Sequence, residues 1–203
     1  MDDTGGSFSE AVLVQARDYL QELISLPILP FERSLKAIAV ITWVLEKVNL
    51  HPIVVGGKAV EIYTTGSYTT MDVDLVVSGR HLVQEALSQL GFQQEPDRRH
   101  WYHSGLHLPI EIPDSILEGS QQRVMDVDVD GYTLHVIGVE DLILDRLRAA
   151  VHWKSLTDQE WAEFLLAAHW ESIDLNYLEN EASRPENDVR DLLDKLLHTI
   201  DSD

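Results

Sequence analysis

The stretch that decides the fold is HPIVVGGKAVEIYTTGSYTTMDVDLVV, residues 51–77. Its apolar run at residues 53–55 predicts a short buried strand, which ends at the pair Gly56-Gly57. A helix of one to two turns is expected next, and then a polar loop that leads into a second strand over residues 72–77. The segment therefore predicts a strand, a glycine turn, a short helix and a second strand.

Two carboxylates open that second strand. Because side chains alternate between the two faces of a strand, Asp72 and Asp74 project from one face and Val73 from the other. Like charges at this spacing repel each other unless a cation lies between them, and carboxylate oxygens are hard ligands that suit Mg²⁺. The pattern predicts a cation site, whereas the competing interpretation is acidic residues that keep an edge strand soluble.

The combination of Gly56, Gly57, Asp72 and Asp74 resembles the signature of the polymerase-beta-like nucleotidyltransferase superfamily. The resemblance is to its minimal nucleotidyltransferases and AbiEii-type toxins in particular. The fourteen residues between Gly57 and Asp72 are at the long end for this signature, and the loop lacks the arginine that such families often carry before the acids. The resemblance implies Mg²⁺ or Mn²⁺ as cofactor and an NTP as substrate.

A later segment extends the resemblance. VEDLILDRL at residues 139–147 is similar to the Leu-Glu-Asp-Leu-Ile-x-x-Lys-Leu helix of AbiEii-type and related nucleotidyltransferases. This places the phosphate-contacting lysine of the family on Arg146 and a later family acid on Asp158. The two segments together span residues 52–170, which is most of the chain.

A two-metal site for phosphoryl chemistry needs a third acid, and Glu111 is the candidate. The apolar residues on one face of its expected strand are Leu108, Ile110 and Ile112. Glu111 projects from the other face, where its desolvation is costly unless a cation or a donor offsets it. We therefore expect Glu111 to meet Asp72 and Asp74 from a neighbouring strand, and to share metal with them.

The chain also contains a second Met-Asp-Val-Asp, at residues 125–128. The residues before Asp126 leave no room for a turn, a helix and a loop, and the chain after Asp128 enters an Asp130-Gly131 turn. Asp-Gly favours a type I′ hairpin, which places both acids on the outer face of a β-ribbon. We exclude this pair from the predicted site.

Gly56 and Gly57 allow phosphate to approach the backbone, and the helix expected to begin at Lys58 presents free N–H groups to a triphosphate. An ordinary tight turn would explain the same two glycines. Lys58 and Arg146 are candidates for neutralising phosphate charge, although a solvated surface position explains them equally well. The remaining nucleotide-binding candidates are two loop hydroxyls, Ser67 and Thr69.

Composition limits the function classes. The chain has 203 residues, 44% of them hydrophobic, which indicates a globular protein, and the absence of cysteine excludes disulfides and thiolate metal sites. Its net charge of −20 argues against general DNA binding, because a phosphate backbone needs a basic footprint. We expect a cytoplasmic protein that does not enter a membrane, since it has neither a long apolar run nor a basic leader.

The expected fold class is α+β, a mixed β-sheet core of the nucleotidyltransferase fold flanked by N- and C-terminal helices. The regions are a helical arm at residues 1–50, the core at 51–137 and a helical region at 138–203. The first helix should bury an apolar stripe made of Val12, Val14, Ala16, Tyr19, Leu20, Leu23 and Ile24. In the C-terminal region, Thr157 is expected to cap one helix and Pro185 to begin another at its first position.

Three histidines suggest an alternative metal. His100, His103 and His107 lie within eight residues, and a fourth ligand would complete a zinc site. In an extended chain, however, His100 and His103 fall on opposite faces. We therefore disfavour zinc there.

The favoured function is a Mg²⁺-dependent nucleotidyltransferase that moves an NMP from an NTP to an acceptor hydroxyl and releases pyrophosphate. The resemblance implies tRNA or a protein side chain as acceptor, a toxin–antitoxin or defence role, and a cognate antitoxin as partner. A small-molecule acceptor such as an aminoglycoside stays open. The alternative is a catalytically idle protein of this fold that binds a nucleotide or a partner helix, which the acidic surface and the missing loop arginine support.

Overall fold

The glycine turn and its two strands form as the sequence predicts. In the computed structural model, which describes residues 7–96 and 99–200, β1 (Ile53–Val55) leads directly into α3 (Gly56–Tyr63). The chain then returns as β2 (Val73–Val76), antiparallel to β1. The helix begins at Gly56, two residues before the Lys58 start that the sequence suggested.

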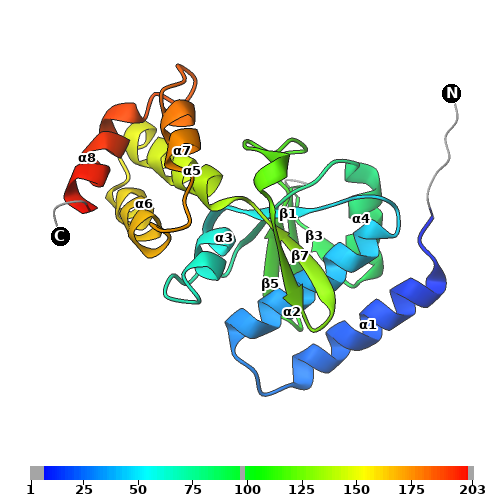
Figure 1. Ribbon diagram of the computed structural model, residues 1–203. Coiled ribbons are helices and arrows are strands. Elements are labelled where there is room, and N and C mark those ends of the chain that lie inside the picture. The colour runs from blue at the N-terminus through cyan, green and yellow to red at the C-terminus, as the bar shows by residue number, and fades with distance from the viewer. Residues whose placement is uncertain (1–6, 97–98, 201–203) are drawn as a thin grey trace, which may run out of the picture.

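The described strands form one mixed seven-stranded sheet in the order β3-β4-β5-β2-β1-β7-β6. Figure 1 shows the sheet between the N-terminal helices α1 and α2 and the C-terminal helices α5 to α8. The five remaining strands are β3 (Gln93–Gln94), β4 (His100–His103), β5 (Leu108–Glu111), β6 (Met125–Val129) and β7 (Tyr132–Val136). β1 is an interior strand and runs parallel to β7, while β2, the middle strand, runs parallel to β5. This sheet, with helices on either side in the sequence, confirms the predicted α+β nucleotidyltransferase-type fold.

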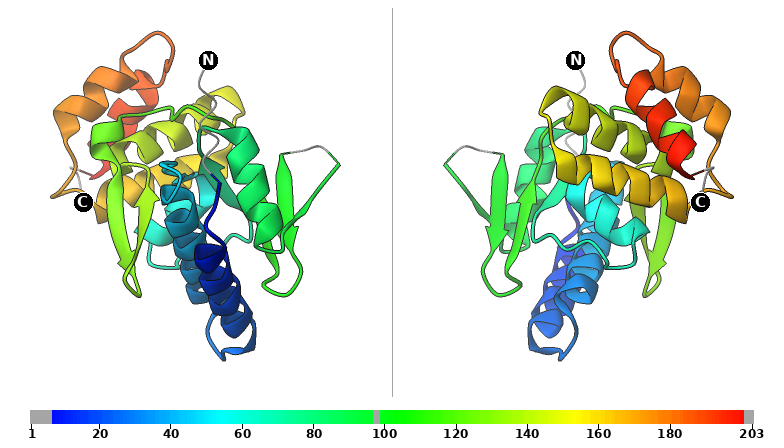
Figure 2. Two further views of the ribbon diagram at one scale, coloured as in Figure 1. Left: turned by 90° about the vertical axis from the view of Figure 1, so that its right-hand side faces the viewer. Right: turned by 90° about the vertical axis from the view of Figure 1, so that its left-hand side faces the viewer.

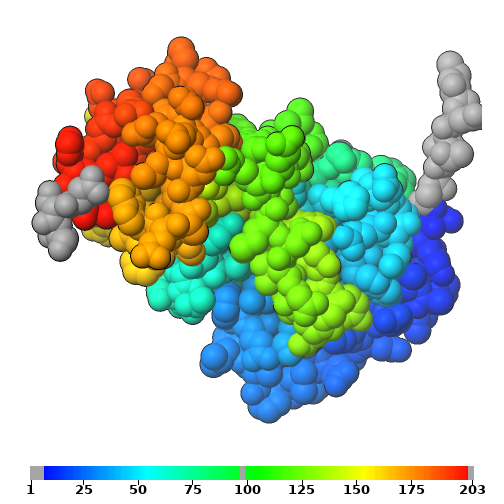
Figure 3. Space-filling model, in the orientation of Figure 1, coloured from blue at the N-terminus to red at the C-terminus, as the bar shows by residue number. Residues whose placement is uncertain are grey.

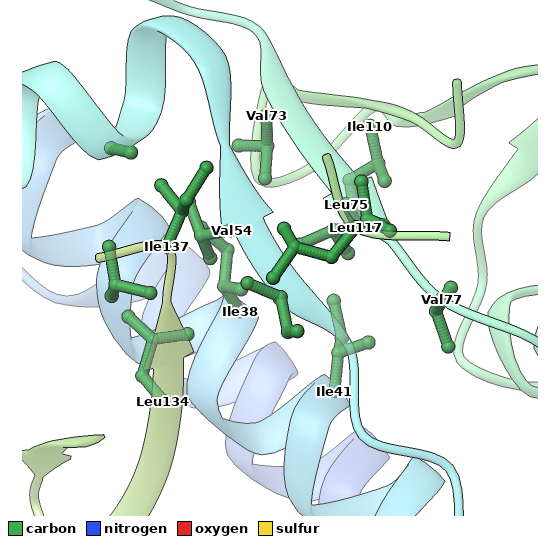
Figure 4. Close-up of a cluster of buried hydrophobic side chains, with 14 of the residues drawn as sticks. Ile38, Ile41, Val54, Val73, Leu75, Val77, Ile110, Leu117, Leu134 and Ile137 are labelled. Atoms are coloured by element: carbon green, nitrogen blue, oxygen red, sulfur yellow. The ribbon is translucent and has the colours of Figure 1, made fainter. Parts of the chain in front are cut away.

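α2 (Pro30–Glu46) packs against β7 and β6 of the sheet, and α1 (Glu10–Ser25) packs against α2. Figure 2 shows this helix pair between the β6–β7 hairpin and the β4–β5 ribbon. In the core, Ile38 and Ile41 of α2 meet Val54 and Leu75 from the central strands (Figure 4). Burying each such side chain contributes about 1.5–3 kcal/mol, so the α2 interface is a main source of stability.

The apolar face of α1 differs from the predicted stripe in one respect. Val14 is 42% exposed, whereas Leu13 is buried. The buried residues of α1 are Leu13, Ala16, Leu20 and Leu23. These positions follow a spacing of three or four residues, so they form the single stripe that packs inward, and Val14 lies outside it.

Two glycine turns are as expected. Asp130 (φ 55°) and Gly131 (φ 82°) both have positive φ, which is the type I′ geometry predicted for the β6–β7 hairpin. α4 (Arg80–Gln89) is followed by its C-cap, Leu90, and then by Gly91, whose φ of 91° terminates the helix as the sequence indicated.

Four helices make up the C-terminal region, α5 (Val139–His152), α6 (Leu156–Ala168), α7 (Leu175–Ala182) and α8 (Arg190–Ile200). They form a lobe beside the sheet, drawn yellow to red in Figure 3. Glu140 and Asp141 of α5 tie this lobe to the core. Glu140 accepts bonds from Arg123 (3.1 Å) and the Asp174 amide (2.9 Å), and Asp141 from the Ser120 amide (2.8 Å) and the Tyr177 hydroxyl (2.7 Å).

Two helix starts in this lobe were predicted wrongly. The N-cap of α6 is Ser155, whose hydroxyl accepts the Asp158 amide at 3.3 Å, so Thr157 already lies inside the helix. Pro185 lies in the turn after α7, and α8 begins five residues later at Arg190. None of the helices within residues 7–96 and 99–200 combines the length and apolarity of a membrane span.

Candidate active site

Acidic side chains from two adjacent strands meet beside the glycine turn. Asp74 is the register partner of Val55 in β1 and of Glu111 in the parallel strand β5. Neighbouring strands lie about 4.7–4.9 Å apart, so Glu111 stands directly beside Asp74. Val73 and Ile110 point into the core instead (Figure 4), which leaves Asp74 and Glu111 on the opposite face. For Asp74 and Glu111, the alternation and the neighbouring-strand placement are as the sequence predicts, whereas β2 begins at Val73, so Asp72 precedes the strand and is exposed.

These acids line a cavity of about 390 Å³. Its polar lining consists of Gly56, Gly57, Tyr68, Thr70, Asp72, Asp74, His100, Glu111 and Arg146. A second cavity of about 360 Å³ shares Gly56, Asp74 and Arg146 with the first, and its lining adds Arg148 and the exposed Trp153. The two hollows therefore meet at Asp74.

Negative charge predominates around Asp74, and the basic groups nearby offset it only in part. Burial raises the pKa of Asp74 from 3.8 to about 6, and repulsion from Glu111 and Asp72 adds to this, while Arg146 acts in the opposite direction. Three carboxylates around one position are the donor set that Mg²⁺ and Mn²⁺ prefer. The donor chemistry and the raised pKa therefore both fit a divalent cation.

The three acids are not closed into a finished metal site. Among the described residues, the three side chains whose ligand atoms lie within 4.8 Å of one another are Glu46, His51 and His135, at the other end of β1. Glu111 is turned toward basic neighbours, with its carboxylate oxygens 3.1 Å from His100 Nε2 and 3.7 Å from an Arg99 nitrogen. A cation shared with Asp74 would compete with these two contacts of Glu111.

Gly56 is required by its contact with Asp74 as well as by its backbone. Its φ is +61°, and a Cβ at this position would lie 2.3 Å from Oδ2 of Asp74. At Gly57 a Cβ would lie 3.2 Å from the Tyr68 hydroxyl, with no positive φ. A tight turn alone does not need so close an approach to a carboxylate, so Gly56 belongs to the site.

The loop before β2 presents different side chains from those predicted. Tyr68 and Thr70 line the acidic cavity, while Ser67 and Thr69 are exposed and lie outside that lining. This loop contains turns and bends and is not an extended strand, so no strand periodicity in the sequence identifies which of its side chains face the cavity.

Lys58 has contacts that do not fit the predicted role on phosphate. Its side chain is 2% exposed, and its ammonium group binds Glu61, the Ser34 hydroxyl (3.3 Å) and the Thr70 carbonyl (3.1 Å). Since α3 begins at Gly56, Lys58 falls within the first helical turn and its ammonium reaches α2 at Ser34. The positive charge of Lys58 is therefore paired with Glu61 inside the protein.

Arg146 is the cation that faces Asp74. It lines both cavities, and its guanidinium pairs with Asp145 and with Asp158, the latter at 2.7 Å. Asp158 is the acid that the resemblance singled out, and here it holds Arg146. The Nε of Arg146 is buried without a hydrogen-bond partner among the described residues.

The second Met-Asp-Val-Asp lies far from the acids. β6 forms one edge of the described sheet, with β7 and β1 between it and β2. Asp126 and Asp128 are exposed on that strand, where Asp126 contacts His135 at 2.7 Å. The three clustered histidines diverge as well, because His100 contacts Glu111, His103 packs on Phe92 and His107 contacts Tyr102.

No protein-family model and no curated protein matches this chain. Among solved structures, an antigenic nucleotidyltransferase-like protein from Paracoccidioides brasiliensis has a TM-score of 0.54 at 14% identity, over 87% of this chain and 93% of that one. ANT(2'')-Ia with adenylyl-2''-tobramycin has a TM-score of 0.49 at 18% identity, over 68% and 88% of the two chains. A solution structure of the antibiotic-resistance factor ANT(2'')-Ia has a TM-score of 0.47 at 14% identity, over 96% and 97%. The first of these similarities shows the fold.

Proposed function

We propose that the protein is a Mg²⁺- or Mn²⁺-dependent nucleotidyltransferase, which moves an NMP from an NTP to an acceptor hydroxyl. The observation that carries the proposal is that Asp72, Asp74 and Glu111 line one cavity with the glycine turn, where burial and repulsion between the acids raise the pKa of Asp74 to about 6. Stability alone gives no reason to keep like charges together in a half-buried position. The fold similarity is consistent with this chemistry.

Each group then has a role. Asp72, Asp74 and Glu111 would hold the cation, which would neutralise charge that develops on the phosphates and align the reacting oxygens. Gly56 leaves room for the Asp74 carboxylate against the glycine turn, and the first N–H groups of α3 would face the negative charge of a phosphate. Arg146 adds a positive charge on the other side of Asp74.

In the transfer, the acceptor oxygen attacks the α-phosphorus, a new P–O bond forms, and the bond to the β-phosphate breaks, so that pyrophosphate leaves with its electron pair. The acceptor hydroxyl must lose its proton. Glu111 is the candidate to receive it, because it contacts His100 at 3.1 Å and can pass the proton on.

For the acceptor, we propose an RNA or protein hydroxyl, as the resemblance to AbiEii-type toxins suggests, together with a defence role and a cognate antitoxin. The net charge of −20 restricts any RNA contact to a local one. The cavity with Trp153 and Arg148 adjoins Asp74, so it is the place where an acceptor would approach. A small-molecule acceptor would use the same cavity.

A second function, nucleotide or partner binding without catalysis, has its own support. Lys58 is paired inside the protein, Arg146 is already paired with two acids, and Glu111 already contacts His100. A protein in this state would bind a nucleotide weakly and transfer nothing.

The test separates the two functions. Purified protein is incubated with each α-labelled NTP and Mg²⁺ or Mn²⁺, in turn with total RNA, with a protein extract and with small-molecule acceptors. Transfer of label that disappears in Asp74→Asn supports the enzyme, and the fraction labelled identifies the acceptor. Nucleotide binding without transfer supports the idle module. If the protein neither binds a nucleotide nor transfers label, both proposed functions are overturned.

A further inference from the structure

A second group of metal-type ligands lies at the opposite end of β1. Glu46 ends α2, His51 lies in the loop that leads into β1, and His135 is on β7. One ligand atom from each lies within 4.8 Å of the other two. His135 is the register partner of Ile53, the first residue of β1, whereas Asp74 is the partner of Val55, the last. The two groups of ligands are therefore separate.

The geometry brings two imidazoles and a carboxylate to one point. Nε2 of His135 is 2.9 Å from Oε1 of Glu46, and Nδ1 of His51 is 3.8 Å from the same oxygen. Two histidines and one carboxylate are a donor set of Zn²⁺ and related transition metals, while Mg²⁺ prefers oxygen alone. The His51 side chain is 59% exposed and the His135 side chain 14%, so the group is open to solvent on one side and a water can take the remaining position.

Asp126 provides the carboxylate partner that a metal-bound histidine normally has on its second ring nitrogen. Its carboxylate lies 2.7 Å from Nδ1 of His135 and thereby orients the ring with Nε2 toward Glu46. Histidine ligands usually donate their second N–H to such a carboxylate, which fixes the tautomer. An ionised carboxylate only accepts hydrogen bonds, so contacts from both ring nitrogens of His135 require two ring protons. A cation that binds here replaces the Nε2 proton.

We propose that Glu46, His51 and His135 bind one transition-metal cation of the Zn²⁺ class, with Asp126 as the positioning residue for His135. The cation joins the end of α2, the loop before β1 and the β6–β7 hairpin. Without metal, the same residues form an ion-pair network around a protonated His135. The proposal is independent of the nucleotidyl transfer proposed above.

The test uses Co²⁺ as a spectroscopic probe and Zn²⁺ in calorimetry, both with excess Mg²⁺ to occupy the acidic cavity. We expect one equivalent to bind, with the visible absorption of a histidine-ligated Co²⁺. Calorimetry in buffers of different ionisation enthalpy should show release of about one proton, because ligands must lose their protons to bind metal. Zn²⁺ should also raise the unfolding temperature, since it binds only the folded protein.

Three variants decide the assignment. His51→Ala removes an exposed ligand with little risk to folding and should weaken Zn²⁺ binding at least tenfold. Asp126→Asn should weaken it about 10–100-fold, the usual effect of losing a carboxylate that supports a histidine ligand. The matched control is His81→Ala, an exposed histidine on α4, which should bind like the parent. Equal Zn²⁺ affinity in the parent and in His51→Ala, or no stoichiometric binding, would leave only the ion-pair network and overturn the proposal.

Discussion

The two ends of β1 hold polar clusters that handle charge in opposite ways. At the carboxyl end, burial and two neighbouring acids raise the pKa of Asp74 to about 6. At the amino end, burial alone would lower the pKa of His135, but hydrogen bonds to Asp126 and Glu46 raise it. At the acidic cluster, Arg146 only partly offsets the burial and repulsion that raise the pKa of Asp74, whereas at the histidine cluster two carboxylates favour a proton on His135. A cation bound at the acidic cluster would add positive charge that the cluster lacks, whereas a cation bound at the histidine cluster would have to displace a proton.

The largest effect should come from removing a charge at the acidic end. Asp74→Asn should abolish metal-dependent NTP binding, a loss greater than the roughly 100-fold that substitutions outside the ligand shell reach. Asp126→Asn, on the other Met-Asp-Val-Asp, should bind NTP like the parent. Calorimetric titration with each NTP and Mg²⁺ measures both. Equal losses in the two variants would remove the distinction between the clusters.

The glycine turn provides the next contrast. Gly56→Ala places a side chain in the left-handed region and against Asp74, and should lower the free energy of unfolding by about 2–4 kcal/mol. Gly57→Ala, in the first turn of α3, should stay within about 1 kcal/mol of the parent. Urea unfolding compares them. If Gly57→Ala is the more destabilised variant, the close approach at Gly56 is not what constrains the turn.

The pH dependence of stability should distinguish the clusters further. The pKa of Asp74 rises on folding from 3.8 to about 6, so its charge opposes folding. That cost is absent below pH 4, develops between pH 4 and 6, and is complete above pH 6. In the presence of a chelator, Asp74→Asn should therefore melt at a higher temperature than the parent at pH 7.5, and at the same temperature near pH 4. A lower melting temperature at pH 7.5 would contradict the raised pKa.

The smallest effect is expected at the histidine end. Because the pKa of His135 is raised on folding, its protonation favours the folded state below pH 6.5, and this contribution is lost as pH rises through the folded pKa. Metal-free His135→Gln should therefore lose more stability at pH 5.5 than at pH 8.5, as measured by thermal unfolding. His81→Ala is the control and should show no such difference. A loss that is independent of pH would mean that packing, not charge, makes His135 important.

Local periodicity accounts for what could be predicted. Strand alternation correctly placed Asp74, Val73 and Glu111, and the Asp130-Gly131 pair correctly placed a hairpin. These features are determined by residues that are close together in the sequence, so a local pattern is enough to predict them.

Lys58 was chosen for its positive charge, whereas its ammonium group binds Glu61, Ser34 and Thr70 inside the protein. Ser67 and Thr69 were chosen by residue type, whereas the side of the chain that faces the cavity belongs to Thr70 and Tyr68. The Glu46–His135 contact joins residues 89 positions apart, which no local pattern connects.

Because β1 is short, the two clusters interact electrostatically. Three residues separate them by only about 7 Å along the strand, and two strand spacings add about 10 Å across it. Each of these two components is comparable with the Debye length of about 8 Å at physiological salt. Mobile ions screen the interaction only weakly, because protein fills most of the space between the clusters. A divalent cation at the histidine end would therefore lower the pKa of Asp74 and reduce the electrostatic attraction of the acidic cavity for a second cation.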